Sequence, residues 1–115
     1  MAFLILYVTH SSEEEARRIA DAAVSARLAA CANLFPIQSS YWWDGKMESG
    51  EEWVSILKTT PYLEQRMEEF IERLHPYETP CIMRWEVRAN EAYENWILAS
   101  VLRREEVDGA KVDRF

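Results

Sequence analysis

Only a few side chains in this sequence could do chemistry, and two of them are imidazoles. His10 and His75 are the only histidines, so a Ser-His-Asp or Cys-His arrangement would have to use one of them. No HExxH, CxxC or glycine-rich phosphate loop occurs, and three glycines in the whole chain cannot form such a loop. Because no nucleophile with a plausible base can be named, the sequence predicts that the protein is not an enzyme.

His75 is the first candidate ligand for a metal ion. It opens the segment HPYETP (75–80), in which Glu78 could add a carboxylate to the imidazole. Imidazole binds borderline and soft divalent metals, so the pair predicts a metal site. The alternative is that His75 ends a helix and interacts with its last carbonyl groups. His10 is interpreted as a solvated loop residue.

Lys58 is the second candidate, because it interrupts the otherwise apolar run VSILKTT (54–60). A lysine in such a place must reach solvent or pair with an acid. One interpretation is a salt bridge across the sheet or to a neighbouring subunit. The other is a cationic group in a cleft near residues 75–80, where it would hold a small anionic ligand.

Three tryptophans and two cysteines complete the set of candidate side chains. Trp42, Trp43 and Trp53 could stack on a ligand, although tryptophans more often anchor a core or an interface. Cys31 and Cys81 lack zinc-type spacing, and we interpret both as thiols packed like small hydrophobic side chains.

The hydrophobic pattern predicts a scaffold of strands and helices that must position these side chains. The predicted elements are, in order, a strand at Phe3–Thr9, a helix at about Glu13–Arg27, strands at Cys31–Trp43 and Trp53–Thr60, a helix opened by Thr60 and Pro61, a strand at Cys81–Val87 and a helix capped by Asn90. This order predicts one α+β domain at 1–115, with a ferredoxin-like βαββαβ antiparallel sheet and an extra C-terminal helix. The tail from Arg103 is expected to fray or to pack on the surface.

Local signals refine this scaffold at four places. Ser12 has a glutamate three residues later, which is the capping-box pattern of a helix start. The dipeptide at 44–45 (Asp-Gly) is typical of a hairpin turn. Pro36 indicates a bulge or an edge strand, and residues 48–52 are expected to form an acidic loop or twist before the next strand.

The strand at 53–60 is apolar on both of its faces. Trp53 and Val54 are adjacent large residues, as are Ile56 and Leu57. A strand that is apolar on both faces is buried on both, and the chain's own helices can cover only one of them. We therefore predict a homo-oligomer whose interface includes Trp42, Trp53, Val54 and Ile56.

Composition and charge exclude several classes of partner. The chain has 115 residues, 13 basic and 20 acidic, and a net charge of −7. Nucleic acids and anionic membranes both require a basic surface, so neither is an expected partner. The first ten residues carry no basic region and no small-residue cleavage site, and no apolar run is long enough to span a membrane. We expect a cytoplasmic location.

Four segments together resemble one known family. They are RLAACANLFPIQSSYWWDGK (27–46), EEWVSILKTT (51–60), LHPYETP (74–80) and YENWI (93–97), and they resemble the CutA family of divalent-cation tolerance proteins. The resemblance implies a ferredoxin-like subunit and a tight homotrimer, with long hairpins around the three-fold axis, similar to the trimer of PII signalling proteins. It also implies a link to copper and other divalent metals, with no reaction assigned.

The resemblance implies a copper site that this sequence matches only in part. In the family, a cysteine late in the first strand and two adjacent histidines before Pro-Tyr have been associated with copper. Here the corresponding positions are Val8, Leu74 and His75, and one imidazole alone gives a weak site. Copper would therefore need further ligands from Glu78, from a thiol, or from a second subunit.

The resemblance also implies a cleft between subunits. The matched residues expected to line it are Trp43, Lys58, Tyr77 and Glu78. The favoured function is weak binding of divalent metal, such as copper, at these clefts, with no cofactor required. Two alternatives remain: a PII-like module that binds a small anionic molecule, and a trimeric scaffold for a protein partner.

Overall fold

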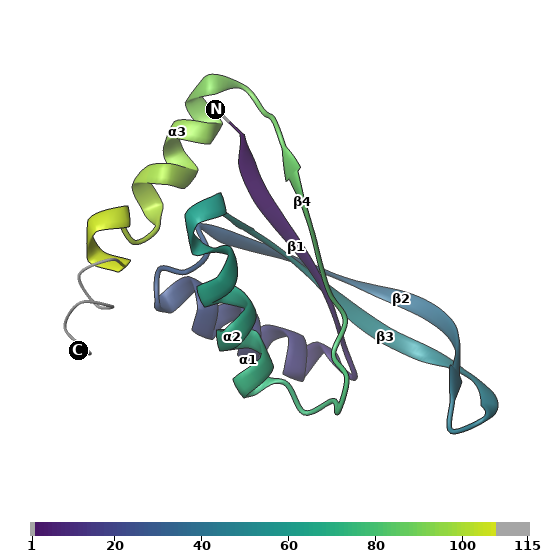
Figure 1. Cartoon of the computed structure of the whole chain (residues 1–115). Helices are drawn as coiled ribbons and strands as arrows, with labels where there is room; N and C mark the ends of the chain where they lie inside the picture. The colour runs from purple at the N-terminus through teal and green to yellow at the C-terminus, as the bar shows by residue number, and fades with distance from the viewer. Residues whose placement is uncertain (1, 108–115) are drawn as a thin grey trace.

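The computed structural model describes residues 2–107, and it contains the predicted order of strands and helices. The elements, shown in Figure 1, are β1 (Phe3–His10), α1 (Glu13–Ser25), β2 (Cys31–Trp43), β3 (Lys46–Thr59), a 3-10 turn (Pro61–Leu63), α2 (Glu64–Leu74), β4 (Ile82–Val87) and α3 (Glu91–Ser100). The mixed α+β class is confirmed.

The four strands form one antiparallel sheet in the order β2-β3-β1-β4. Helices α1 and α2 cover one face of it, on the left of the sheet in Figure 1. Leu57 of β3 lies between Leu6 of β1 and Ala32 of β2, and it belongs to the core that these helices close. Successive side chains of a strand point to opposite faces, so Leu4, Leu6 and Val8 enter this core while the residues between them face away from it.

The β2–β3 hairpin is longer than the sequence analysis predicted. Its turn is the predicted Asp-Gly pair, and both Asp44 (φ 52°) and Gly45 (φ 75°) adopt the left-handed conformation that a type I′ turn requires. The ladder then runs without interruption from Trp43 opposite Lys46, so residues 48–52 are part of β3. The expectation of an acidic loop there was wrong, because a two-stranded ribbon leaves acidic side chains exposed to water on both faces.

Pro36 lies opposite Trp53 in a continuous ladder, so the structure contains no bulge at that point. The other interpretation of Pro36 is confirmed, because β2 is an edge strand of the sheet. An edge strand has one side without a neighbouring strand, and a proline can turn its missing N–H to that side.

The hairpin projects well beyond the rest of the subunit (Figure 1). The radius of gyration is 15.3 Å, whereas a compact chain of this length has about 13 Å. A ribbon of two strands cannot bury its own side chains, since it has no helix layer beneath it. Trp42 and Met47, which are paired near the tip, are accordingly 75% and 69% exposed.

The helix starts agree only in part with the sequence signals. Ser12 caps α1, and its hydroxyl oxygen accepts a hydrogen bond from the Glu15 backbone N–H at 3.1 Å. Thr60 precedes a 3-10 turn instead of α2 itself, and its hydroxyl has no hydrogen-bond partner among the described residues. Helix α2 ends at Leu74, immediately before His75 and Pro76.

Residues 101–107 pack onto the domain, which is one of the two outcomes expected for the start of the tail. The Leu102 N–H donates to the Arg27 carbonyl at 2.9 Å, and Val107 in the helical turn at 104–107 is buried in the core. The remainder of the predicted tail lies outside the described residues. Within 2–107, no helix is long and apolar enough to cross a membrane.

Candidate functional site

A cleft of about 780 Å³ lies between the β2–β3 hairpin and the connection from α2 to β4. Its lining residues are Thr9, Gln38, Ser39, Ser40, Tyr41, Trp43, Glu52, Tyr77, Glu78, Thr79 and Cys81. Three aromatic rings, two carboxylates and a thiol therefore meet here, and no described residue of the lining is basic. The structure thus brings together three of the predicted site residues, namely Trp43, Tyr77 and Glu78.

Tyr77 joins the two sides of the cleft. Its hydroxyl group donates a hydrogen bond to Oε2 of Glu52 at 2.9 Å, across 25 residues of sequence. Burial raises the pKa of Tyr77 well above its usual value, and the neighbouring Glu52 carboxylate raises the pKa further. The phenol therefore stays protonated and remains a donor. Sequence analysis missed Glu52 as a site residue, because nothing local indicates which strand residue will meet Tyr77.

His75 lies behind the cleft, and both of its ring nitrogens are engaged. Nε2 is 2.7 Å from the carbonyl oxygen of Thr9, and Nδ1 is 3.1 Å from the backbone nitrogen of Tyr77. A carbonyl can only accept and a backbone N–H can only donate, so Nε2 carries the proton and Nδ1 accepts. No ring lone pair is left for a metal ion. The residue holds the start of the 75–80 segment against the end of β1.

His10 is buried, so its interpretation as a solvated loop residue was wrong. Its Nε2 lies 2.8 Å from Oγ of Ser55, and its ring stacks on His75 with centroids 5.2 Å apart. Burial, and to a smaller extent the nearby His75, lower the pKa of His10 to about 4. The strand alternation could have revealed this placement, because His10 continues the inward series of Leu6 and Val8.

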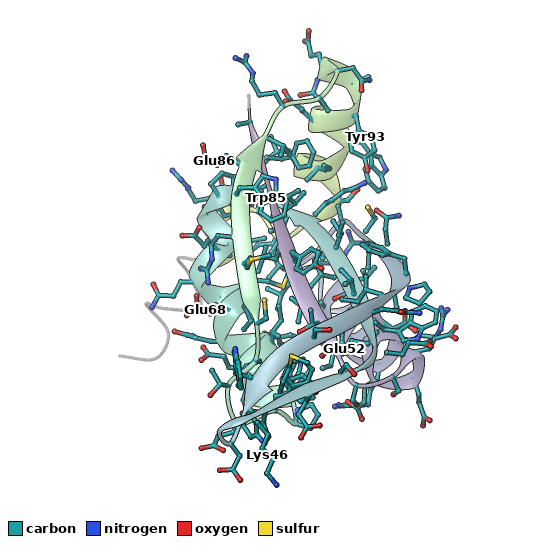
Figure 2. The ribbon with its side chains drawn as sticks, turned by 90° about the vertical axis from the view of Figure 1, so that its right-hand side faces the viewer. Lys46, Glu52, Glu68, Trp85, Glu86 and Tyr93 are labelled. Atoms are coloured by element: carbon teal, nitrogen blue, oxygen red, sulfur yellow. The ribbon has the colours of Figure 1, made fainter. Side chains whose placement is uncertain are left out.

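Lys58 lies away from the cleft of its own subunit. Its Nζ is 3.1 Å from the hydroxyl oxygen of Tyr93 on α3, which also lies 3.6 Å from Sγ of Cys31. Lys58 lies six positions after Glu52 in β3, a span of about 20 Å in an extended strand. Figure 2 shows Tyr93 near the top of the molecule and Glu52 near the bottom. Within one subunit Lys58 therefore does not line this cleft, and its expected place in a cleft between subunits stays a prediction. No described acidic residue forms a salt bridge with it.

The predicted interface residues fall into different environments. Trp42 is largely exposed at the hairpin, whereas Trp53 and Ile56 are partly buried by their own chain. Val54 is 0% exposed, so it has no surface left for another subunit to cover, and its prediction as an interface residue was wrong.

A second exposed apolar surface lies on the sheet face away from α1 and α2; the sequence analysis expected this face to be apolar but missed the β4 residues on it. Figure 2 looks onto this face and labels Trp85 of β4. Trp85 is 44% exposed, Met83 is 47% exposed and Phe35 is 37% exposed. The alternation of β4 carries the signal, since Met83 and Trp85 are two residues apart and so share a face.

The expected copper positions do not form a metal site in one subunit. Val8 is buried in the core and Leu74 packs against the core. Both side chains are aliphatic, so neither has an atom that could bind a metal ion. Among residues 2–107 no group of three or more His, Cys, Asp or Glu could hold a metal ion. Cys31 and Cys81 are both free thiols, and burial raises the pKa of Cys81.

Comparison with known proteins now assigns the chain to a family. The model of the family described as CutA1 divalent ion tolerance protein matches residues 4–100. The divalent-cation tolerance protein CutA of Thermotoga maritima is 41% identical over 100 residues, which are 86% of this chain and 99% of that protein.

Two solved structures show the same fold. The crystal structure of CutA1 from Pyrococcus horikoshii has a TM-score of 0.84 and 37% identity, and the match covers 87% of this chain and 99% of that one. CutA1 from Oryza sativa has a TM-score of 0.84 and 32% identity, over 89% and 95% of the two chains. The resemblance found in the sequence is confirmed: this chain belongs to the CutA1 family of divalent ion tolerance proteins.

Proposed function

We propose that this protein is a non-catalytic, trimeric binding protein that takes up divalent cations weakly at clefts between subunits. The observation that carries the proposal is the acidic character of the cleft at Tyr77, where Glu52 and Glu78 lie and no described lining residue is basic. Carboxylates are suitable ligands for divalent cations, and the names of the relatives link them to tolerance of these ions. No cofactor is required for this function.

The carboxylates, and not His75, are the metal ligands in this proposal. Both nitrogens of the His75 ring are already hydrogen-bonded, whereas Glu78 is exposed. Two carboxylates give a weak site, and a neighbouring subunit would have to supply the remaining ligands. Copper is the first ion to test, because the thiol of Cys81 also lines the cleft and soft ligands favour it.

The trimer is supported by exposed apolar surface that the subunit cannot cover. The open sheet face carries Met83 and Trp85, and the hairpin tip carries Trp42. Surfaces of this kind mark interfaces in soluble proteins. Light scattering should give three times 13.5 kDa, or about 40 kDa. A stable 13.5 kDa species would contradict the trimer. A cytoplasmic location is part of the proposal, since two free thiols suit a reducing compartment.

Calorimetric titration with Cu²⁺ tests the metal site. We expect Glu78→Gln to weaken binding at least about fivefold, because a charged ligand is replaced by a neutral one of the same shape. Glu72→Gln is the matched control, since Glu72 is exposed on α2 and does not line the cleft. Identical isotherms for the unmodified protein and Glu78→Gln would reject the proposed ligand set.

The PII-like alternative is favoured by one observation. Lys58 donates to the Tyr93 hydroxyl group and forms no salt bridge with a described carboxylate, so its charge could serve an anionic ligand. A thermal-shift screen of nucleotides and small organic anions tests this alternative. Stabilisation that disappears in Lys58→Ala would support it. The same stabilisation in both proteins would reject Lys58 as the anion-binding group.

A further inference from the structure

We propose that the cleft at Tyr77 binds an organic cation, specifically a quaternary alkylammonium group. The inference goes beyond the proposed function, although it rests on the same acidic cleft. Three rings line this cleft, those of Tyr41, Trp43 and Tyr77, together with the carboxylates of Glu52 and Glu78. Aromatic faces and nearby negative charge are the two features that recognise ammonium groups in proteins.

The size of the cleft favours a ligand larger than a bare ion. Its volume is about 780 Å³, whereas one water molecule takes about 30 Å³ of liquid. Cavities that bind organic molecules have volumes of roughly 300–1,000 Å³. An inorganic cation also needs several ligands in direct contact, and no described group of three His, Cys, Asp or Glu provides them. An organic cation can fill the space and needs no such group.

The strand geometry directs the aromatic residues to one side of the hairpin. Tyr41 and Trp43 are two residues apart on β2, so they share a face, and Glu52 lies on the same face because it is paired with Ile37. Tyr77 meets them from the connection between α2 and β4, where its hydrogen bond to Glu52 holds the ring. The lining therefore comes from two segments that approach each other across the cleft.

Two of the three rings are exposed in the subunit, whereas Tyr77 is partly buried and its ring contacts that of His75. Trp43 is 54% exposed and Tyr41 is 46% exposed in the subunit. Among the described residues, side-chain cations lie over the rings of Tyr62 and Tyr93, neither of which lines this cleft. Lys46 is paired with Trp43 in the ladder, but it is not part of the lining. The chain therefore places no cation of its own over the rings of the cleft.

The hydrogen bonding of the cleft favours a quaternary over a primary ammonium group. A primary ammonium group has three N–H donors that need acceptors when water is removed. One oxygen of Glu52 already accepts from Tyr77, which leaves fewer acceptors for such donors. A quaternary group has no N–H donors, and its charge is spread over methyl groups that pack on aromatic faces. Glu52 and Glu78 then contribute through charge alone.

Calorimetric titration of the assembled protein with choline tests the inference. The matched ligand control is 3,3-dimethylbutan-1-ol, which has the same shape without the charge. We expect choline to bind at least about tenfold more tightly than the alcohol, because only choline gains the attraction to the rings and the carboxylates. Equal affinities, or no heat from choline at millimolar concentrations, would overturn the inference.

Protein variants distinguish this inference from the metal proposal. Trp43→Leu should weaken choline binding at least about fivefold, because it removes an aromatic face from the cleft. Trp96→Leu is the matched control, since Trp96 is exposed on α3 and does not line the cleft. Choline binding without Cu²⁺ binding would reject the metal proposal alone, whereas Cu²⁺ binding without choline binding would reject this inference alone.

Folding of the variants is checked by light scattering, which should give the mass of the unmodified protein. If Trp43→Leu does not assemble, Trp43→Phe keeps an aromatic ring and should retain measurable choline binding, weaker than that of indole. The comparison of choline with its neutral analogue uses the unmodified protein and decides the question independently of any variant. An unchanged choline affinity in an assembled Trp43→Leu protein would overturn the role of the ring.

Discussion

The two faces of the sheet are formed by the same strands, but one is buried and the other is partly exposed. On the face covered by α1 and α2, Leu6, Val8 and Leu57 are fully buried. On the other face, Met83 and Trp85 keep almost half of their surface exposed. Side chains alternate between the two faces along each strand, so adjacent apolar residues can differ in burial.

One subunit buries less apolar surface than the hydrophobic pattern of its strands would suggest. Leu57 and Ile56 are adjacent aliphatic residues of similar size, yet only Leu57 is closed off completely. The chain has two helices for one face, and α3 reaches the other face only at the end where Tyr93 meets Lys58. An apolar face of this kind needs a second copy or a partner to cover it.

The largest expected effect comes from the covered face. Leu57→Ala should lower the free energy of unfolding by about 2–5 kcal/mol, because it leaves a cavity among rigidly packed neighbours. Ile56→Ala is the control on the open face, where the side chain is only partly buried. Urea unfolding at one fixed protein concentration measures both. Equal losses would mean that the assembly buries the two faces equally well.

The second-largest expected effect is the pH dependence of stability caused by His10, at the end of the covered face. His10 has a pKa of about 4 in the fold, and an unfolded histidine has about 6.5. Between these values the unfolded chain binds a proton that the folded chain does not, so acidification favours unfolding. The free energy of unfolding should fall by up to about 3 kcal/mol from pH 7 to pH 4. The urea midpoint of His10→Gln should depend less on pH, and parallel curves would contradict the assignment.

A smaller effect is expected at the end of the open face that α3 covers. Lys58→Met removes the hydrogen bond to the Tyr93 hydroxyl group, which should cost about 1 kcal/mol of unfolding free energy. Lys46→Met at the exposed hairpin tip should change it by less than about 0.5 kcal/mol. Thermal melting of both variants gives the comparison. An unchanged melting temperature for Lys58→Met would show that α3 does not depend on this contact.

Trp85→Lys should have the smallest effect on the stability of the subunit and a clear effect on its assembly. Trp85→Lys places a charge on the open face, where the single subunit leaves the side chain exposed, so intrinsic stability should change by about 0.5 kcal/mol or less. If another copy covers this face, the buried charge should dissociate the complex. Light scattering would then fall from about 40 kDa to the 13.5 kDa of one chain. An unchanged mass would place the interface elsewhere.

Much of the fold could be predicted from local signals. The Asp44-Gly45 turn, the Ser12 cap and the end of α2 before Pro76 all follow from short-range preferences of the backbone. The extent of β3 could not be predicted in this way. Its acidic residues resemble a loop in sequence, and only pairing with β2 makes them a strand.

The candidate site was predictable only in part, because its members meet through long-range contacts. Tyr77 and Glu78 were found through the motif at 75–80, but the partner Glu52 was not. Lys58 was expected to line a cleft between subunits, because of its unusual position in an apolar strand and because of the family resemblance. Within one subunit the direction of β3 places it far from Tyr77, beside Tyr93.

The sequence by itself determined the order of the elements, the family and the alternation that sends Leu57 inward, since all three depend on residues close together in the chain. The tertiary structure decided the hydrogen bonds of His75, whose ring reaches Thr9 across 66 residues. It also decided which aromatic rings and carboxylates share a cleft. The physical reason is that strand register fixes such distant pairings cooperatively, and no short segment of sequence contains that information.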